Sequence, residues 1–91
     1  CLKNVKSGQA LHLAVNGVFI AVGIKPLSSA FEGVVEMENG YIRAGEDGKT
    51  SVQGIFAAGD VRTKALRQII TAAADGANAV TSVERYLNEK Y

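Results

Sequence analysis

The sequence contains only one cysteine, Cys1, among its 91 residues. A single thiol excludes an internal disulfide, a Cys-x-x-Cys redox pair and a cluster of thiolates around a metal ion. We therefore expect no redox dithiol and no thiolate metal site within this chain.

Neither sign of charge dominates, because ten Lys and Arg residues and nine Asp and Glu residues leave a net charge of +1. This balance gives no electrostatic case for nucleic acid or an anionic membrane as partner. The longest apolar run, residues 18–22, is far shorter than the roughly 20 residues of a membrane helix, and no signal peptide is recognisable. We expect a soluble, cytoplasmic protein.

The sequence also predicts too few helices to cover both faces of a buried sheet. Residues 17–23 and 55–58 are apolar throughout, which is typical of strands buried on both faces of a parallel sheet. Such a sheet needs a layer on each face, yet the pattern provides only one long helix. The chain also begins with Cys1 and not with Met. We expect an α/β fragment of a longer protein, incomplete as a domain.

The most informative stretch is residues 54–80, GIFAAGDVRTKALRQIITAAADGANAV, which predicts a strand, an acidic loop and a helix. Gly59 ends the strand, and Asp60 follows at its carboxyl end, the edge where open α/β sheets bind ligands. A carboxylate repels phosphate but accepts hydrogen bonds from the hydroxyl groups of a polyol. The alternative role for Asp60 is that of a turn or helix-cap residue.

Apolar residues at spacings of three, four and seven predict that the helix has one apolar face for about six turns. This face comprises Leu66, Ile70, Ala73, Ala77, Val80 and Leu87. Arg67 and Gln68 fall at the helix start, where unpartnered backbone N–H groups attract anions and carbonyl oxygens. Arg67 is either a surface cation or a functional one, since the helix dipole disfavours a cation there unless an anion lies nearby.

Two hairpins are expected before this stretch. Their strands and turns are residues 2–6 and 10–15 around Ser7-Gly8, and residues 34–37 and 41–44 around the loop 38–40. Asn39-Gly40 in the second loop is the strongest short hairpin signal. Between the hairpins, residues 27–31 are expected to form one helical turn, with Ser28 as a possible cap and Phe31 packed on the core.

Two further groups could be interpreted as sites. His12 could be a general base or metal ligand, but no second ligand lies at a useful spacing, which favours a solvent-facing strand residue. Glu46 and Asp47 could hold a metal, but they lie in a glycine-containing loop without calcium-loop spacing. We interpret all three as surface residues.

Three segments together resemble a known family. They are TSVQGIFAAGDVRTKALRQIITAAADGANA at residues 50–79, GVFIAVGIKP at residues 17–26 and ENGYI at residues 38–42. In this order they are similar to the C-terminal, flavin-binding segment of bacterial-type, low-molecular-weight thioredoxin reductases, within the FAD-dependent pyridine nucleotide-disulfide oxidoreductases. The Gly-Asp pair followed seven residues later by Arg-Gln is the most specific element of the resemblance.

The resemblance implies a fold and a set of contacts. Residues 1–16 would be the tail of the NADPH-binding domain, and residues 17–91 the C-terminal part of a Rossmann-like FAD-binding domain. Asp60 would hold the ribityl hydroxyls of FAD, and the helix start would meet the carbonyl edge of the flavin pyrimidine ring. The implied cofactor-binding residues are Gly59, Asp60, Val61, Arg67, Gln68 and Ile69.

The resemblance also implies an activity that needs more than this chain. The full-length protein would pass electrons from NADPH through FAD to a disulfide in thioredoxin or a thioredoxin-like protein, as a homodimer. The chain has no G-x-G-x-x-G fingerprint for either dinucleotide. NADPH would therefore bind mainly to regions absent from it, and we expect the 91 residues alone to be inactive.

Two alternatives remain open. The same segment resembles thioredoxin-reductase-like ferredoxin-NADP reductases and alkyl hydroperoxide reductase flavoproteins, which keep the flavin and change the electron acceptor. The short chain is also compatible with a non-catalytic interaction module that has kept the strand, loop and helix.

Overall fold

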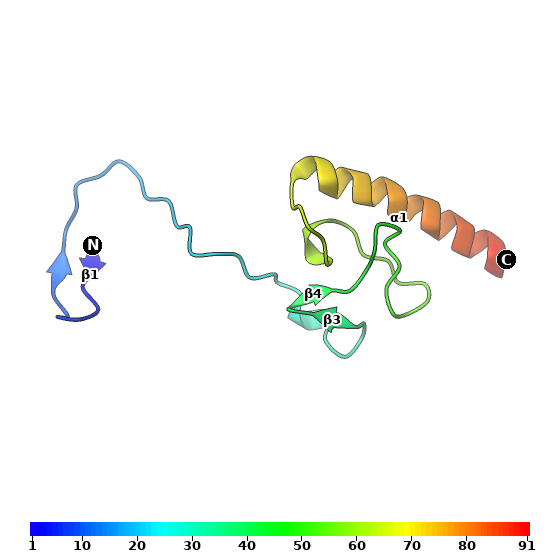
Figure 1. The fold of residues 1–91 in the computed structure, drawn as a ribbon, viewed down its shortest axis with the longest axis horizontal. Coiled ribbons are helices and arrows are strands. Elements are labelled where there is room, and N and C mark those ends of the chain that lie inside the picture. The colour runs from blue at the N-terminus through cyan, green and yellow to red at the C-terminus, as the bar shows by residue number, and fades with distance from the viewer.

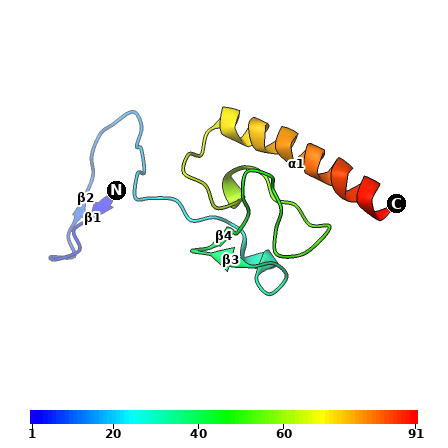
Figure 2. The same ribbon diagram turned by 45° about the vertical axis from the view of Figure 1, so that its right-hand side comes forward.

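A computed structural model describes residues 1–91 and consists of an extended N-terminal arm and a folded body. The arm runs to about residue 27, and the body contains every helix and the second hairpin (Figure 1). The whole chain measures 65 × 28 × 18 Å along its principal axes. Figure 2 confirms that the arm stands clear of the body in a second view.

The arm begins with a short antiparallel hairpin. β1 (Leu2–Lys3) pairs with β2 (Ala10–Leu11), with Leu2 opposite Leu11. The expected strands at residues 2–6 and 10–15 are therefore too long, and the connection is wider than Ser7-Gly8. Its cause is Asn4, whose side-chain oxygen accepts hydrogen bonds from the backbone N–H groups of the second and third residues after it, at 2.9 and 3.1 Å. This local bonding bends the chain before the ladder can extend.

The expected strand at residues 17–23 is not formed. Its backbone follows an extended path, but it pairs with no other segment of the chain. Its side chains are exposed: Phe19 is 101% accessible and Val22 91%. A strand is defined by its ladder of hydrogen bonds, and an apolar run without a neighbouring strand has no ladder to join.

The body opens with a turn and the second hairpin. The 3₁₀ turn η1 (Ser29–Phe31) leads to β3 (Met37–Glu38), which pairs antiparallel with β4 (Tyr41–Ile42). Asn39 and Gly40 both have positive φ, 51° and 83°, as a tight type I′ connection requires. The expected hairpin is confirmed.

The two expectations for η1 were only partly right. Ser28 lies at the cap position but makes no cap hydrogen bond, and its hydroxyl donates instead to the carbonyl oxygen of Gly40. Ser28 is 2% exposed, so it fastens the turn to the hairpin from inside the body. Phe31 is 47% exposed and only partly packed, so it does not anchor the loop as expected.

The expected strand at residues 55–58 is reduced to a single antiparallel bridge, in which Phe56 lies opposite Lys49. No parallel ladder forms around it, because the sheets within the chain each contain two antiparallel strands. The 3₁₀ turn η2 (Gly59–Val61) follows directly, so the expected turn after the apolar run is present.

α1 (Ile69–Lys90) is a helix of 22 residues, which confirms the long helix predicted from its periodicity. It begins later than expected, so Leu66 and Arg67 lie in the loop before it. It packs on the body through a face other than the apolar one. Asp75 and Ser82 are buried on that packed face, whereas Ile70 is 77% and Val80 69% exposed. No helix has the length and apolar character of a membrane span.

A small core lies between the hairpin and the segment before η2. It comprises Val35, Ile42, Ala44 and Ala57, with Met37 packed against it. Four buried apolar side chains provide little hydrophobic stabilisation, so polar contacts carry much of the task of holding α1 and η2 in place.

Candidate functional site

Asp60 lies in the middle of η2, at the turn between the apolar run and the loop that leads to α1. Gly59 before it has a φ of 82°, a left-handed conformation that glycine adopts without strain. The Asp60 side chain is exposed, and its carboxylate forms no hydrogen bond or ion pair within the chain. Val61 closes the turn and is 37% exposed.

The start of α1 presents free donors close to this turn in the chain. Gln68 is the N-cap, and its backbone N–H is already used by the hydroxyl of Thr71 at 2.9 Å. The next two N–H groups, those of Ile69 and Ile70, find no acceptor in the chain. Their side chains are 91% and 77% exposed, so this helix end is open. Free N–H groups and the helix dipole favour an electron-rich group at this position.

Arg67 joins the turn to the helix start. Its Nε donates to the backbone carbonyl oxygen of Asp60 at 3.1 Å, and Nη2 donates to that of Arg62 at 3.1 Å. The guanidinium also lies 3.8 Å from the ring centroid of Tyr41, a cation–π contact. The structure thus brings two of the predicted site residues, Asp60 and Arg67, into contact, and Arg67 braces the backbone of the loop.

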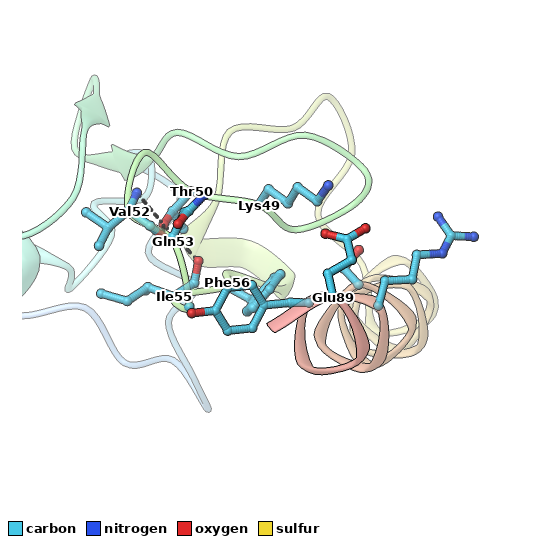
Figure 3. A pocket seen from close by; sticks show the side chains of 11 residues that line it. Lys49, Thr50, Val52, Gln53, Ile55, Phe56 and Glu89 are labelled. Carbon is cyan, nitrogen blue, oxygen red and sulfur yellow. Dashed lines mark hydrogen bonds between the residues drawn. The ribbon is translucent and has the colours of Figure 1, made fainter. Parts of the chain in front are cut away.

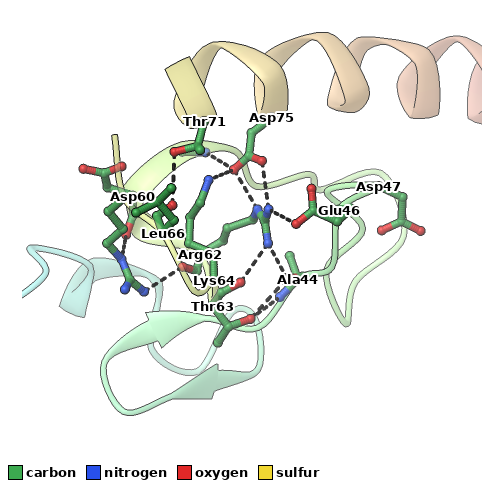
Figure 4. A network of polar contacts seen from close by, with 12 residues as sticks. Ala44, Glu46, Asp47, Asp60, Arg62, Thr63, Lys64, Leu66, Thr71 and Asp75 are labelled. Carbon is green, nitrogen blue, oxygen red and sulfur yellow. Dashed lines mark hydrogen bonds and ion pairs between the residues drawn. The ribbon is translucent and has the colours of Figure 1, made fainter. Parts of the chain in front are cut away.

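A buried polar network lies beneath the turn (Figure 4). The Asp75 carboxylate accepts hydrogen bonds from Arg62 Nε at 2.7 Å and Nη2 at 2.8 Å, and from Lys64 Nζ at 2.8 Å. It also accepts the backbone N–H of Gly59 at 2.9 Å. Asp75 is 3% exposed and Arg62 2%. Two oxygens shared among four donors leave this carboxylate fully paired.

The rest of the Arg62 guanidinium is also used. Nη1 donates to the carbonyl oxygens of Ala44 and Thr63, at 3.3 and 2.8 Å, and Nη2 also binds Glu46 Oε1 at 2.9 Å. The network therefore ties α1, the loop after η2 and the loop around Glu46 together. Glu46 is more than the surface residue we expected, because it pairs with Arg62, although its side chain remains 82% exposed.

The charged groups in the network shift the pKa values of their partners. Hydrogen bonding from Arg62 holds the pKa of Asp75 well below its usual value, against the opposing effect of burial, and Lys64 and the Gly59 N–H act in the same direction as Arg62. Asp75 in turn raises the pKa of Arg62. Both groups therefore stay charged throughout the physiological pH range.

Sequence reasoning missed this network. One signal was available: an aspartate, Asp75, interrupts a run of alanines on the helix. An ionised group among small side chains on a helix face is costly unless it is paired. Its partner Arg62 lies 13 residues away, however, and no periodic pattern connects the two.

A pocket of about 290 Å³ lies at the opposite end of α1 from the Asp60 turn. Figure 3 shows it between the loop of Thr50, Gln53 and Ile55 and the last turns of the helix. Phe56 and Tyr86 form part of its wall and contact each other edge to face, with ring centroids 6.1 Å apart. Every buried side-chain polar atom in the structure already has a partner, so none points into the pocket unpaired.

Comparisons with known proteins agree with the family resemblance. The family model described as pyridine nucleotide-disulphide oxidoreductase matches residues 2–76. A thioredoxin reductase of Bacillus subtilis is 45% identical over 89 residues, which cover 97% of this chain and 28% of that protein. A thioredoxin reductase of Vibrio cholerae is 47% identical over 94 residues, covering 98% of this chain and 30% of that protein.

A solved structure is also similar. The crystal structure of thioredoxin reductase from Streptococcus pyogenes matches with a TM-score of 0.76 and 44% identity. The match covers 96% of this chain and 29% of that one. This chain therefore spans less than a third of the length of the relatives it matches.

Proposed function

This chain belongs to the pyridine nucleotide-disulphide oxidoreductase family, and on that premise we propose that it holds the flavin in a thioredoxin reductase. The full-length protein would take electrons from NADPH and deliver them through FAD to the disulfide of thioredoxin or a thioredoxin-like protein. The expected α/β fold, part of an FAD-binding domain, is confirmed by the match to solved reductases.

The proposal divides the chain at residue 16. The exposed hairpin of β1 and β2 would close the NADPH-binding domain, and residues 17–91 would belong to the FAD-binding domain. In Figure 1 the β1–β2 hairpin lies apart from the body, as expected for a segment that belongs to a different domain. The apolar residues 17–23 would then join a sheet completed by other parts of the full-length protein.

The donor and acceptor set near Asp60 fits FAD. Asp60 offers an exposed, unbonded carboxylate, which suits the hydroxyl groups of a ribityl chain. The open start of α1 offers the N–H of Ile69, and Gln68 offers its exposed side-chain amide, which suits carbonyl oxygens. Gly59, Val61 and Arg67 would complete the site by holding the backbone of the turn.

FAD, when bound, supplies the two-electron chemistry, and this chain would supply binding and electrostatics. The N-terminal end of α1 carries partial positive charge and would favour electron density on the pyrimidine edge of the flavin. Because its N–H groups are fixed in the helix, they would do so without reorganising. No residue of the chain is proposed to transfer a proton or act as nucleophile, and the 91 residues alone would be inactive.

One observation carries the proposal. The backbone of the Asp60 turn is fastened on both sides, by the Gly59 N–H to Asp75 and by the Asp60 carbonyl oxygen to Arg67. The Asp60 side chain, in contrast, is free. A fixed backbone that presents an unbonded polar group is the arrangement of a prepared binding residue.

The electron acceptor separates the reductase from its alternatives. The full-length protein should be purified with its flavin and mixed with NADPH and oxidised thioredoxin, ferredoxin or the peroxidase partner of a hydroperoxide reductase. We expect rapid NADPH oxidation with thioredoxin, and a dimer by light scattering. Turnover with ferredoxin and not with the other two acceptors would favour a ferredoxin-NADP reductase. Turnover with only the peroxidase partner would favour an alkyl hydroperoxide reductase flavoprotein. A full-length protein with no flavin and no NADPH oxidation would indicate the interaction module.

A further inference from the structure

The ion pair of Arg62 and Asp75 sits directly beneath the one free carboxylate of the turn. Asp75 binds the backbone N–H of Gly59, the residue before Asp60, at 2.9 Å. Arg62 is the second residue after Asp60, and its guanidinium binds Asp75 through two nitrogens at 2.7 and 2.8 Å. The same carboxylate therefore fixes the chain on both sides of Asp60.

The contact between Arg62 and Asp75 fixes an orientation as well as a distance. A guanidinium and a carboxylate joined by two parallel hydrogen bonds fix both distance and orientation. In Figure 4 Arg62 and Asp75 lie between α1 and the loop, whereas the Asp60 carboxylate points to the outer side of the turn. The pair thus determines where α1 lies relative to the turn, without itself occupying the outer surface.

Stability alone is a weak reason for burying these charges. Taking two ions out of water is costly, and apolar residues of similar volume often serve a fold as well. Arg62 and Asp75 are nevertheless almost fully buried, at 2% and 3% exposure. An apolar pair in the place of Arg62 and Asp75 would fill the space but leave the Gly59 N–H without an acceptor.

We propose that Arg62 and Asp75 are positioning residues for flavin binding. They hold the Asp60 carboxylate and the start of α1 in a fixed position relative to each other. This inference rests on the function proposed above. Asp75 lies in the second turn of α1, so the pair links the helix that would meet the ring to the turn that would hold the ribityl chain. Neither residue is proposed to touch the flavin.

The test is a double-mutant cycle on FAD affinity in the apoprotein of the full-length flavoprotein. The variants are Asp60→Ala, Asp75→Asn and the double variant, with Glu84→Gln as the matched control. Glu84 is an exposed carboxylate on the same helix, and the structure shows no hydrogen bond to it. FAD affinity is measured by fluorescence quenching, and thermal unfolding of each apoprotein is recorded beside it.

Positioning predicts that Asp75→Asn weakens FAD binding about tenfold and that the loss caused by Asp60→Ala shrinks by about the same factor in the Asp75→Asn background. Glu84→Gln should leave the affinity unchanged. If Asp75 had a purely structural role, Asp75→Asn would lower the unfolding temperature of the apoprotein. The fold-losses of FAD affinity caused by Asp75→Asn and Asp60→Ala would then be independent, and their product would give the loss in the double variant. That result, or an unchanged FAD affinity in Asp75→Asn, would overturn the proposal.

Arg62→Lys provides the second variant, in case Asp75→Asn fails to fold. It keeps the positive charge but cannot reproduce the two-nitrogen fork, so the same coupling to Asp60→Ala is expected with a smaller loss of stability. Full additivity with Arg62→Lys would refute the inference. Failure of the proposed function is distinguished by the single variant Asp60→Ala, which would then bind FAD as tightly as the unmodified protein.

Discussion

Gly48 and Ala57 approach so closely that only a glycine fits at position 48. The Ala57 N–H donates to the Gly48 carbonyl oxygen at 2.8 Å, and a Cβ on Gly48 would lie 2.9 Å from the Ala57 carbonyl oxygen. The same Cβ would lie 3.3 Å from the Cβ of Ala79 on α1. The glycine therefore lets the segment before the Asp60 turn and the helix come together.

We predict that Gly48→Ala destabilises the protein more than a comparable glycine substitution. Gly33→Ala is the control, because Gly33 has a φ of 79° against 72° for Gly48, but a Cβ on Gly33 would meet no atom within 4 Å. The left-handed backbone should cost each variant about 1–2 kcal/mol. Gly48→Ala should lose about a further 1–3 kcal/mol through overpacking. Thermal or urea unfolding of the two variants measures the difference, and equal losses would contradict the close contact.

The sequence predicted the elements whose pattern is local. α1 follows from its spaced apolar residues, and the β3–β4 hairpin from Asn39-Gly40. The strand at residues 17–23 was not found, because strand pairing depends on a neighbour that the local sequence cannot specify.

The site was predicted unevenly for the same reason. Asp60 and Arg67 were singled out because they follow an apolar run and open a helix, and the structure brings them into contact. Their proposed roles toward FAD came from the resemblance and remain predictions. The Arg62 and Asp75 pair was missed, since a buried ion pair depends on how α1 docks and leaves no periodic trace in the sequence.

The Asp75 carboxylate should make stability fall at acid pH. Its pKa is lowered in the folded protein by Arg62, Lys64 and the Gly59 N–H, so the unfolded chain binds a proton first as the pH drops. The stabilisation is therefore fully present above about pH 4 and is lost as the pH falls further. Over that acid range, Asp75→Asn should remove up to about 1.4 kcal/mol per pH unit from the slope of unfolding free energy. Glu46 also faces Arg62, so Glu46→Gln is measured alongside, and an unchanged slope in Asp75→Asn would exclude this role.

We predict that the 91-residue chain associates when it is produced by itself. Apolar side chains are exposed along the arm, including Phe19, Ile20 and Val22 at 101%, 84% and 91%, and along α1 at Ile70 and Val80. Exposed apolar area of this extent favours burial against another molecule. Light scattering should detect oligomers, and replacing the three arm residues with serine should reduce them. A monodisperse monomer that melts cooperatively would show that these surfaces need no cover.

Asp60 is predicted to bind flavin and to take no part in a chemical step. In the full-length flavoprotein, Asp60→Ala should lose hydrogen bonds to a charged acceptor worth about 1.5–3 kcal/mol, which lowers FAD affinity roughly ten- to a hundredfold. Turnover per bound flavin should change much less, because the remaining flavin meets the same helix start. Glu84→Ala removes an exposed carboxylate from α1 and should leave both quantities unchanged.

A general acid or base at position 60 would give the opposite result. Flavin content would then stay normal while turnover fell by about a hundredfold or more, since proton transfer contributes on that scale. The measurement is the flavin-to-protein absorbance ratio beside turnover per flavin in the same preparation of Asp60→Ala. Asp60→Asn adds a finer comparison, because its amide keeps one acceptor oxygen for a hydroxyl group but loses the charge. Affinity that falls only partway in Asp60→Asn would identify the hydrogen bonds, and not the turn backbone, as the source of the loss.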